Sequence, residues 1–234
     1  MRFHLLKPSL FLALSAILVV SRSGQAAPHS NQLTEEEKAA GWKLLFDGHS
    51  TEGWRNYGKD SISNGWKVKD GALIRASGGA GDIITKEQFK DFELSLEYRI
   101  SKGGNSGIMF GVQEIDGPPW HTGPEIQIQD NEDGHDPQKS GWLYQFYKST
   151  TDATKPAGEW NQVRFVLRNH GRSELWMNGV KYYEFKKDSP EWESLLEKSK
   201  FAKMPKFGKS DEGHICLQDH GDEVAYRSIK IRPL

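Results

Sequence analysis

The sequence predicts an all-β protein, an antiparallel sandwich or barrel with two short peripheral helices. Short strand-like segments recur along most of the chain and are separated by Gly, Pro or Asn, a pattern typical of such folds. An Asp-Gly pair and an Asn-Gly pair each join two of these segments, and such pairs form the tight hairpins that connect antiparallel strands. Capping signals indicate two helix starts.

The two hairpins are predicted to turn at Asp70-Gly71 and at Asn178-Gly179, because both dipeptides readily adopt the positive φ angles of a two-residue turn. The strands expected from the sequence are residues 66–69, 72–75, 92–100, 107–113, 125–129, 142–147, 162–168, 174–177 and 180–185.

The first helix is predicted to begin after Thr34, which forms a capping box with Glu37, and to end near Gly41. The second begins at Ser189-Pro190 and runs to about Lys200, since proline is tolerated in the first turn of a helix. Both helices are short, so the strands define the fold.

Residues 1–26 are interpreted as a cleaved export signal. A basic start precedes an uncharged apolar run, residues 10–20, that is too short to span a bilayer. Gly24 and Ala26 place small residues at the two positions that signal peptidase reads, which fits cleavage after Ala26, with Ala27 as the rival site. The alternative is an uncleaved membrane anchor. No linker or repeat follows, so residues 27–234 are expected to form one domain, secreted or periplasmic and free of the membrane after cleavage.

Composition excludes some partners and favours others. The 31 basic and 32 acidic side chains leave a net charge of −1, which provides no field for binding nucleic acid. Eight Trp residues include candidates for stacking on sugar rings, although most are expected in the core. The lone Cys216 cannot form an internal disulfide and is interpreted as a small buried hydrophobe. The oligomeric state is not predicted.

The most informative segment is the strand at residues 125–129. Side chains alternate along a strand, so Glu125, Gln127 and Gln129 share one face and the two isoleucines between them share the other. A carboxylate and two amides suit the recognition of sugar hydroxyls. The alternative is an ordinary solvated outer face of a sheet.

A second polar group follows the strand-like residues 214–217. Gln218, Asp219 and His220 stand where the strand opens into a loop, and a His beside an Asp is suited to accept a proton near neutral pH. The alternative is a turn in which Asp219 accepts hydrogen bonds from backbone amides.

Further candidates for sugar binding lie on loops and strand faces. Asn105 follows two glycines that let a backbone approach a ligand or else form a flexible hairpin loop. Trp120 and His121 precede the Glu125 strand, where Trp120 is a candidate stacking platform. Tyr144 and Arg227 complete the set, on predicted strands whose other face is apolar.

Motifs for metal or cofactor chemistry are weak. The side chains that could ligate a metal are His121, Glu125, Asp130, His135, Asp136 and His220. They have no compact spacing such as His-Glu-x-x-His, so no cofactor is predicted, although these side chains are compatible with a divalent cation. The sequence also lacks the nucleophile elbow, phosphate loop and dinucleotide fingerprint of esterases, kinases and dehydrogenases.

A series of short motifs occurs in a fixed order along nearly all of the chain after the signal. They are GWKLLFDG (41–48), GW (53–54), WKVKDG (66–71), DFEL (91–94), NSGI (105–108), EIQIQD (125–130), GEWN (158–161), NG (178–179) and LQDHG (217–221). In this order they resemble the 3-keto-disaccharide hydrolase family. The chain departs from the family pattern at Ser228, where Asn is usual, and at Pro124, where an aromatic residue is usual.

The resemblance implies a legume-lectin-like or glucanase-like antiparallel jelly-roll β-sandwich that hydrolyses 3-keto-glycosides and 3-keto-disaccharides. A ketone at C3 acidifies the C2 proton, a base removes it, the enolate expels the C1 substituent and water adds to C1. We expect Glu125 or His220 as the base, and Arg227 or a divalent cation beside the C3 oxygen. The expected substrate-binding residues are Asn105, Trp120, His121, Gln127, Gln129, Tyr144, Gln218 and Asp219.

Two alternatives use the same fold. A retaining glycosidase needs two carboxylates about 5 Å apart, and here Gln127 and Gln129 occupy the positions where the partner acid is expected. A non-catalytic carbohydrate-binding module is the second alternative, because fold alone does not dictate function.

Overall fold

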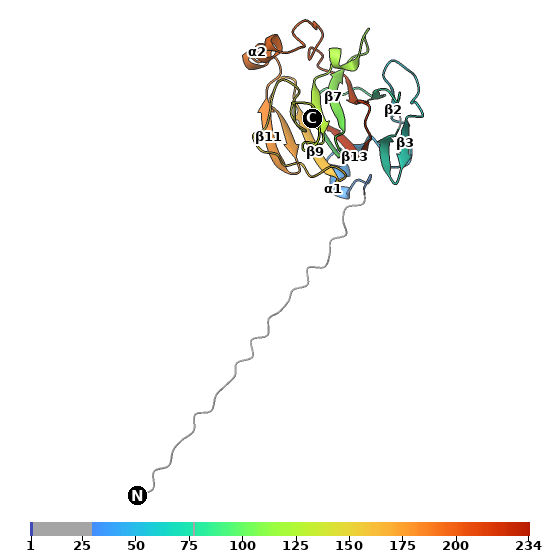
Figure 1. Cartoon of the computed structure of the whole chain (residues 1–234), viewed down its shortest axis with the longest axis vertical. Coiled ribbons are helices and arrows are strands. Elements are labelled where there is room, and N and C mark those ends of the chain that lie inside the picture. Colours follow the sequence, from blue (N-terminus) through green and yellow to red (C-terminus); the bar gives the residue numbers. More distant parts are fainter. Residues whose placement is uncertain (2–29, 77) are drawn as a thin grey trace.

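The computed structural model describes residues 1, 30–76 and 78–234, and the last two ranges form an antiparallel jelly-roll sandwich of two sheets (Figure 1). The predicted signal cleavage at Ala26 lies outside the described residues and stays a prediction. Helices α1 (Glu35–Ala39) and α2 (Pro190–Lys198) lie at opposite ends of the sandwich. No helix in the described part of the chain is long and apolar enough to cross a membrane.

The larger sheet has eight strands. Its order is β11 (Val180–Phe185), β10 (Ser173–Met177), β9 (Asn161–Leu167), β6 (Phe92–Ile100), β13 (Val224–Pro233), β4 (Ala72–Arg75) and β3 (Trp66–Lys69), with β1 (Lys43–Leu44) paired to β13. The central strand β13 is the last in the sequence, so the end of the chain lies between elements from its first half.

The smaller sheet has five strands and carries the candidate site. Its order is β2 (Trp54–Asn56), β5 (Ile83–Thr85), β12 (His214–Leu217), β7 (Asn105–Val112) and β8 (Glu125–Gln129). Strand β12 lies between β5 and β7, which brings residues near 83, 107 and 218 side by side although they are far apart in the sequence.

The turn and capping residues of the sequence form the hairpins and the helix start that they predict. Asp70 and Gly71 both have positive φ angles, 52° and 71°, and join β3 to β4 in register. Asn178 and Gly179 join β10 to β11 in the same way. Thr34 forms the expected capping box, and its side-chain oxygen accepts a hydrogen bond from the Glu37 amide. These parts of the prediction are confirmed.

The strand predicted at residues 142–147 is wrong. Leu143 forms isolated bridges to Ile126 and Tyr147, and the segment then turns at Gln145, whose φ is +65°. A left-handed residue interrupts an extended strand. Even so, the Tyr144 amide donates to the Glu125 carbonyl (2.9 Å), which holds this turn along the edge of β8.

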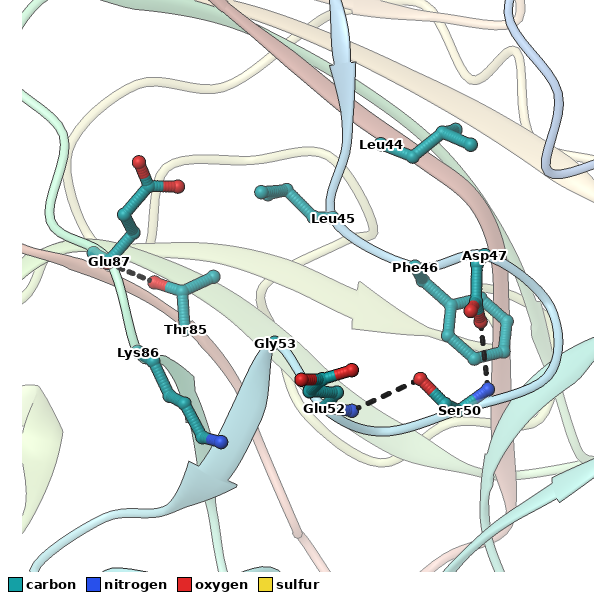
Figure 2. A pocket seen from close by; sticks show the side chains of 10 residues that line it. All are labelled: Leu44, Leu45, Phe46, Asp47, Ser50, Glu52, Gly53, Thr85, Lys86 and Glu87. Atoms are coloured by element: carbon teal, nitrogen blue, oxygen red, sulfur yellow. Dashed lines mark hydrogen bonds between the residues drawn. The ribbon is translucent and has the colours of Figure 1, made fainter.

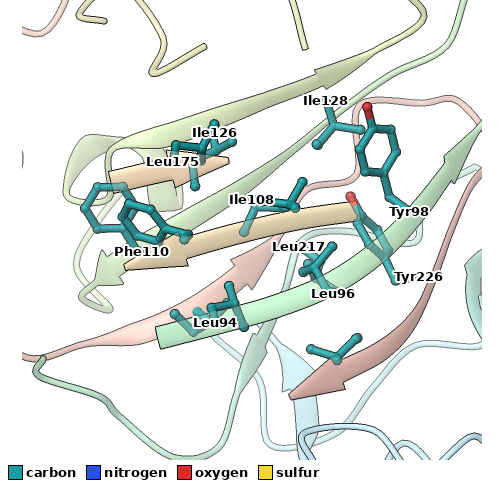
Figure 3. Close-up of a cluster of buried hydrophobic side chains, with 14 of the residues drawn as sticks. Leu94, Leu96, Tyr98, Ile108, Phe110, Ile126, Ile128, Leu175, Leu217 and Tyr226 are labelled. Atoms are coloured by element: carbon teal, nitrogen blue, oxygen red, sulfur yellow. The ribbon is translucent and has the colours of Figure 1, made fainter. Parts of the chain in front are cut away.

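The core lies between the two sheets. Figure 3 shows Ile126 and Ile128 of β8 packed with Leu175 and Tyr98 of the opposite sheet, all of them buried. Because side chains alternate along a strand, Glu125, Gln127 and Gln129 of β8 face outward from the sandwich. Cys216 is fully buried in a separate small cluster, as the sequence predicts.

Candidate active site

A pocket of about 290 Å³ opens on the outer face of the five-stranded sheet. Its lining residues are Asp82, Asn105, Trp120, Glu125, Gln127, Asp136, Tyr144, Lys200, Gln218, Asp219 and His220. The structure therefore brings together most of the site residues predicted from the sequence. Most of them come from β7, β8 and the loop after β12, which the strand order makes neighbours. Trp120 lies on the short 3-10 helix η1 (Pro119–His121), and Tyr144 lies on the turn along the edge of β8.

Glu125 is the central titratable group of this pocket. The residue is only 6% exposed, and burial raises its pKa to about 7. The Lys200 ammonium and the Gln218 amide lower the pKa, whereas the Asp136 and Asp82 carboxylates raise it. A carboxyl group with such a pKa exchanges a proton readily at neutral pH, as a general acid or base must.

The position of the Glu125 carboxyl group depends on a glycine. Gly107 of β7 pairs with Gln127 of β8, which is two residues after Glu125 on the same face of the strand. A Cβ atom on Gly107 would lie 2.4 Å from Oε1 of Glu125. The carboxyl group therefore occupies the space above the glycine backbone, where any other residue would place its side chain.

Amide groups surround this carboxyl group. The Gln127 amide nitrogen donates to the Asn105 side-chain oxygen (3.2 Å), which fixes both side chains at the pocket. Gln218 is 8% exposed, and its side-chain oxygen has no hydrogen-bond partner among the described residues. Buried polar atoms are normally satisfied, so this oxygen is available to a hydroxyl group of a ligand.

Asp82 was not predicted from the sequence. It directly precedes β5, lines the pocket, and accepts a hydrogen bond from the Asp219 amide at Oδ1 (2.8 Å). Burial raises its pKa to about 6; the Asp219 backbone hydrogen bond lowers it, the Asp219 carboxylate raises it and His220 lowers it. The sequence signal was weak, because an Asp after a run of glycines resembles an ordinary turn residue.

Asp219 is fixed by an ion pair within the protein. Its carboxylate accepts from Arg75 Nε (2.5 Å), from the Gly81 amide (2.7 Å) and from the Gly221 amide (3.1 Å). The Arg75 and Asp219 side chains are 6% and 9% exposed. The predicted alternative, in which Asp219 accepts from backbone amides in a turn, therefore describes this residue, although it also lines the pocket.

One wall of the pocket is aromatic and carries a cation. The Lys200 ammonium lies 4.2 Å from the Tyr144 ring centroid and 5.6 Å from that of Trp120. The Tyr144 hydroxyl donates to Asp136 Oδ2 (2.9 Å), and burial together with this carboxylate raises the pKa of Tyr144. Lys200 follows the end of α2, and no motif in the sequence indicated that it would reach the pocket.

Three predicted site residues, His121, Gln129 and Arg227, do not line the pocket. His121 packs edge-on against Trp120, with ring centroids 4.4 Å apart. Gln129 donates to the carbonyls of Asp136 (3.1 Å) and Gln138 (2.6 Å) and so supports the loop that carries Asp136.

Arg227 belongs to the other sheet. Its neighbour Tyr226 faces the core, so its own side chain faces outward on the far side of the sandwich. There Nε donates to Glu97 (2.9 Å), and the guanidinium group lies 4.0 Å from the Trp160 ring centroid. The prediction that Arg227 stands beside the same substrate as Glu125 is therefore wrong.

A second cavity, of about 330 Å³, lies beside β1 and β2 (Figure 2). Its polar side chains form local bonds: Asp47 accepts from the Ser50 amide (2.7 Å), and the Thr85 hydroxyl donates to the Glu87 carbonyl (2.7 Å). None of the predicted site residues lines it. The pocket around Glu125, which most of the predicted site residues line, is the candidate active site.

No group of three or more His, Cys, Asp or Glu side chains suited to a metal ion occurs in residues 30–76 and 78–234. The predicted independence from a cofactor stays a prediction.

Comparison with known proteins identifies relatives of the whole domain. A curated 3-keto-disaccharide hydrolase from Bacteroides thetaiotaomicron is 34% identical over 235 aligned residues, which cover 84% of this chain and 79% of the relative. A crystal structure of a candidate glycosyl hydrolase from Parabacteroides distasonis is 35% identical, with a TM-score of 0.81 and coverage of 88% and 99%.

A second structure from the same organism, also of a candidate glycosyl hydrolase, is 27% identical with a TM-score of 0.62, and the match covers 82% of this chain and 99% of that one. The model of the 3-keto-alpha-glucoside-1,2-lyase-like domain matches residues 41–232, which contain every strand of both sheets except the end of β13. By this match and by the identity to the Bacteroides relative, the chain belongs to the family of 3-keto-alpha-glucoside-1,2-lyase-like domains.

Proposed function

We propose that this protein hydrolyses 3-keto-glycosides, including 3-keto-disaccharides, by removal of the C2 proton, elimination at C1 and addition of water. Membership in the family and the name of the Bacteroides relative support the substrate class. The observation that carries the proposal is the state of Glu125, a buried carboxyl group with a pKa near 7 in a polar pocket.

Glu125 is the proposed base. A ketone at C3 makes the C2 proton acidic, and a carboxylate with a pKa of about 7 accepts that proton better than an ordinary exposed glutamate. His220, the other candidate, is exposed at the pocket. Water competes for an exposed base, so the buried carboxyl group is the better assignment.

Lys200 takes the role that the sequence suggested for Arg227. Removal of the C2 proton places negative charge on the C3 oxygen, and a cation there stabilises the enolate. Lys200 is the one lysine or arginine among the residues that line this pocket. Its place against Tyr144 limits the positions of the ammonium group.

The remaining pocket residues are proposed to bind the sugar. The Asn105–Gln127 pair and the unpaired Gln218 oxygen offer donors and acceptors to hydroxyl groups. Trp120 is half-buried and offers an aromatic face to the apolar side of a ring. These contacts orient the substrate but do not perform the chemistry.

The test compares wild type with Glu125→Gln on a 3-keto-disaccharide and on the same disaccharide without the ketone. We expect wild type to release sugar from the keto form alone, and Glu125→Gln to bind this substrate in calorimetry without cleaving it. Glu132→Gln, a change at an exposed loop residue, is the matched control and should retain full activity.

Each alternative gives a different result in this assay. Cleavage of the unoxidised disaccharide by wild type would identify a conventional glycosidase. Binding of both sugars without any release by wild type would identify a carbohydrate-binding module. Full activity of Glu125→Gln on the keto form would leave the substrate class in place and assign the base to another residue.

A further inference from the structure

Outward-facing residues of adjacent strands form one row across the five-stranded sheet. By the strand register, this row runs from Asp82 through Gln218 and Gly107 to Gln127. The backbone amide of Gln218 donates to the Gly107 carbonyl (2.9 Å), which joins the two middle residues of the row. Glu125 precedes Gln127 on β8, and its carboxyl group covers Gly107. Because β12 and β7 lie between β5 and β8, Asp82 approaches the pocket from the side opposite β8.

The two aspartates at this side differ in how they are bonded. The Asp219 carboxylate accepts hydrogen bonds from Arg75 and from the amides of Gly81 and Gly221. Asp82 accepts one bond, from the Asp219 amide at Oδ1, and the described residues provide no partner for its Oδ2. Asp82 therefore has a free oxygen in the pocket, whereas both oxygens of Asp219 are occupied.

We propose that Asp82 is a second catalytic residue, the acid that protonates the leaving oxygen, and that Arg75 and Asp219 position it. This inference rests on the proposed function, because it concerns the same substrate. Two carboxyl groups on opposite sides of one pocket can serve the two ends of an elimination, one beside C2 and the other beside the oxygen on C1.

The proposed steps are balanced. The Glu125 carboxylate takes the C2 proton, and the C–H electron pair forms the enolate of the C3 ketone. The enolate electrons then form a C1–C2 double bond while the C1–O bond breaks, and the Asp82 carboxylic acid gives its proton to the departing oxygen. In the second half Asp82 takes a proton from water as the water oxygen adds to C1, and Glu125 returns a proton to C2.

The net change is the consumption of one water molecule and the formation of an alcohol and a 3-keto sugar, with no oxidant or reductant. Electrostatics supports the role of Asp82 independently. Burial and the fixed negative charge of Asp219 both raise the pKa of Asp82, to about 6, which lets its carboxyl group carry a proton at mildly acidic pH.

The test uses two 3-keto glucosides that differ only in the leaving group, methoxide or 4-nitrophenolate. Nitrophenolate departs without a proton, whereas methoxide needs one. Asp82→Asn should lower kcat/KM for the methyl glycoside roughly 10²-fold to 10⁴-fold, the usual contribution of general acid catalysis, and that for the nitrophenyl glycoside less than about tenfold. Asp60→Asn, at an exposed aspartate, is the matched control.

Exchange of the C2 hydrogen in D₂O, followed by proton NMR, shows that the variant still has a working site. Asp82→Asn should exchange this hydrogen, and Glu125→Gln should not. Equal losses on the two glycosides, or loss of exchange in Asp82→Asn while Asp60→Asn is normal, would overturn the role of Asp82 and leave the proposed function intact. If wild type cleaved neither glycoside, the proposed function itself would fail.

Discussion

The backbone of Gly107 passes beneath the carboxyl group of Glu125, so closely that a methyl group there would lie 2.4 Å from Oε1. Two neighbouring strands therefore both determine the position of this carboxyl group. Strand β8 supplies the acid and β7 supplies the space that the acid occupies. Glu125 pairs directly with Met109, so Gly107 is its diagonal neighbour on β7. A side chain at this diagonal position would otherwise be within reach of the long Glu125 side chain.

Gly107→Ala should therefore lower activity much more than stability. The added methyl group must displace the carboxyl group, because the glycine backbone in β7 is held between β12 and β8. We expect at least a tenfold loss in kcat on a 3-keto-glycoside, the scale of a misplaced catalytic group. Gly78→Ala, where a Cβ meets nothing within 4 Å, should have wild-type kinetics. Wild-type turnover by Gly107→Ala would contradict the assigned position of Glu125.

The pH dependence of kcat/KM should be bell-shaped for a substrate that needs both proton transfers. Glu125, with a pKa of about 7, must be ionised, and Asp82, with a pKa of about 6, must be protonated. The rate on a methyl 3-keto glucoside should peak between these two pH values. Because the two carboxyl groups interact, the two apparent pKa values describe the pair and not either residue alone. With a nitrophenyl leaving group the alkaline decline should vanish, leaving a rise to a plateau. A decline common to both substrates would contradict this assignment.

Glu125 should also make folding stability depend on pH. Its pKa is raised from 4.5 to about 7 on folding, so its contribution is fully present below about pH 4.5 and is lost as the pH rises through 7. The loss amounts to about 3 kcal/mol in the free energy of unfolding. Urea titrations at pH 5 and pH 8 should show Glu125→Gln gaining stability relative to wild type at the higher pH. A constant difference at the two pH values would show that the pKa is not raised.

Removal of the Arg75 side chain should destabilise the fold, because the buried Asp219 carboxylate would lose its ion-pair partner. We expect Arg75→Met to lower the free energy of unfolding by about 3 to 5 kcal/mol. Adding Asp219→Asn should recover part of this loss, since it removes the unpaired charge. Lys43→Met breaks the exposed Lys43–Glu87 pair and should cost about 1 kcal/mol or less. Equal effects of the two single changes would contradict the structural role of the buried pair.

Lys200→Met should slow turnover with little effect on folding, because the residue is exposed and lies at the pocket rather than in the core. A single donor to a developing oxyanion contributes roughly 10²-fold to kcat, and we expect a loss of that order on 3-keto-glycosides. Lys200→Arg keeps the charge and should retain part of the activity. A change confined to KM would assign Lys200 to substrate binding alone.

The sequence was most informative where a pattern acts locally. The alternation of Glu125 with two isoleucines predicted a polar outer face, and the isoleucines are in the core. The end of the Gln218 strand was also identified correctly as part of the same pocket. The first inference depends only on the period of a strand, which a sequence displays directly. The second depends on the change from apolar to polar residues where the strand ends.

Residues brought in by the topology could not be predicted in the same way. Asp82 and Lys200 reach the pocket because β5 lies beside β12 and because the chain after α2 returns to β8. Arg227 shows the opposite error. Alternation indicates that a side chain faces outward, but it does not tell on which of the two sheets, and Arg227 lies on the far one.

The central claim is that Glu125 removes the C2 proton, and it is tested most directly by cleaving a 3-keto-disaccharide in D₂O and examining the product by proton NMR. The account predicts that wild type releases a 3-keto sugar carrying deuterium at C2, while Glu125→Gln neither labels nor cleaves the substrate. The product incubated without enzyme supplies the background exchange. Release of a product that retains its original C2 hydrogen in every molecule would contradict the account.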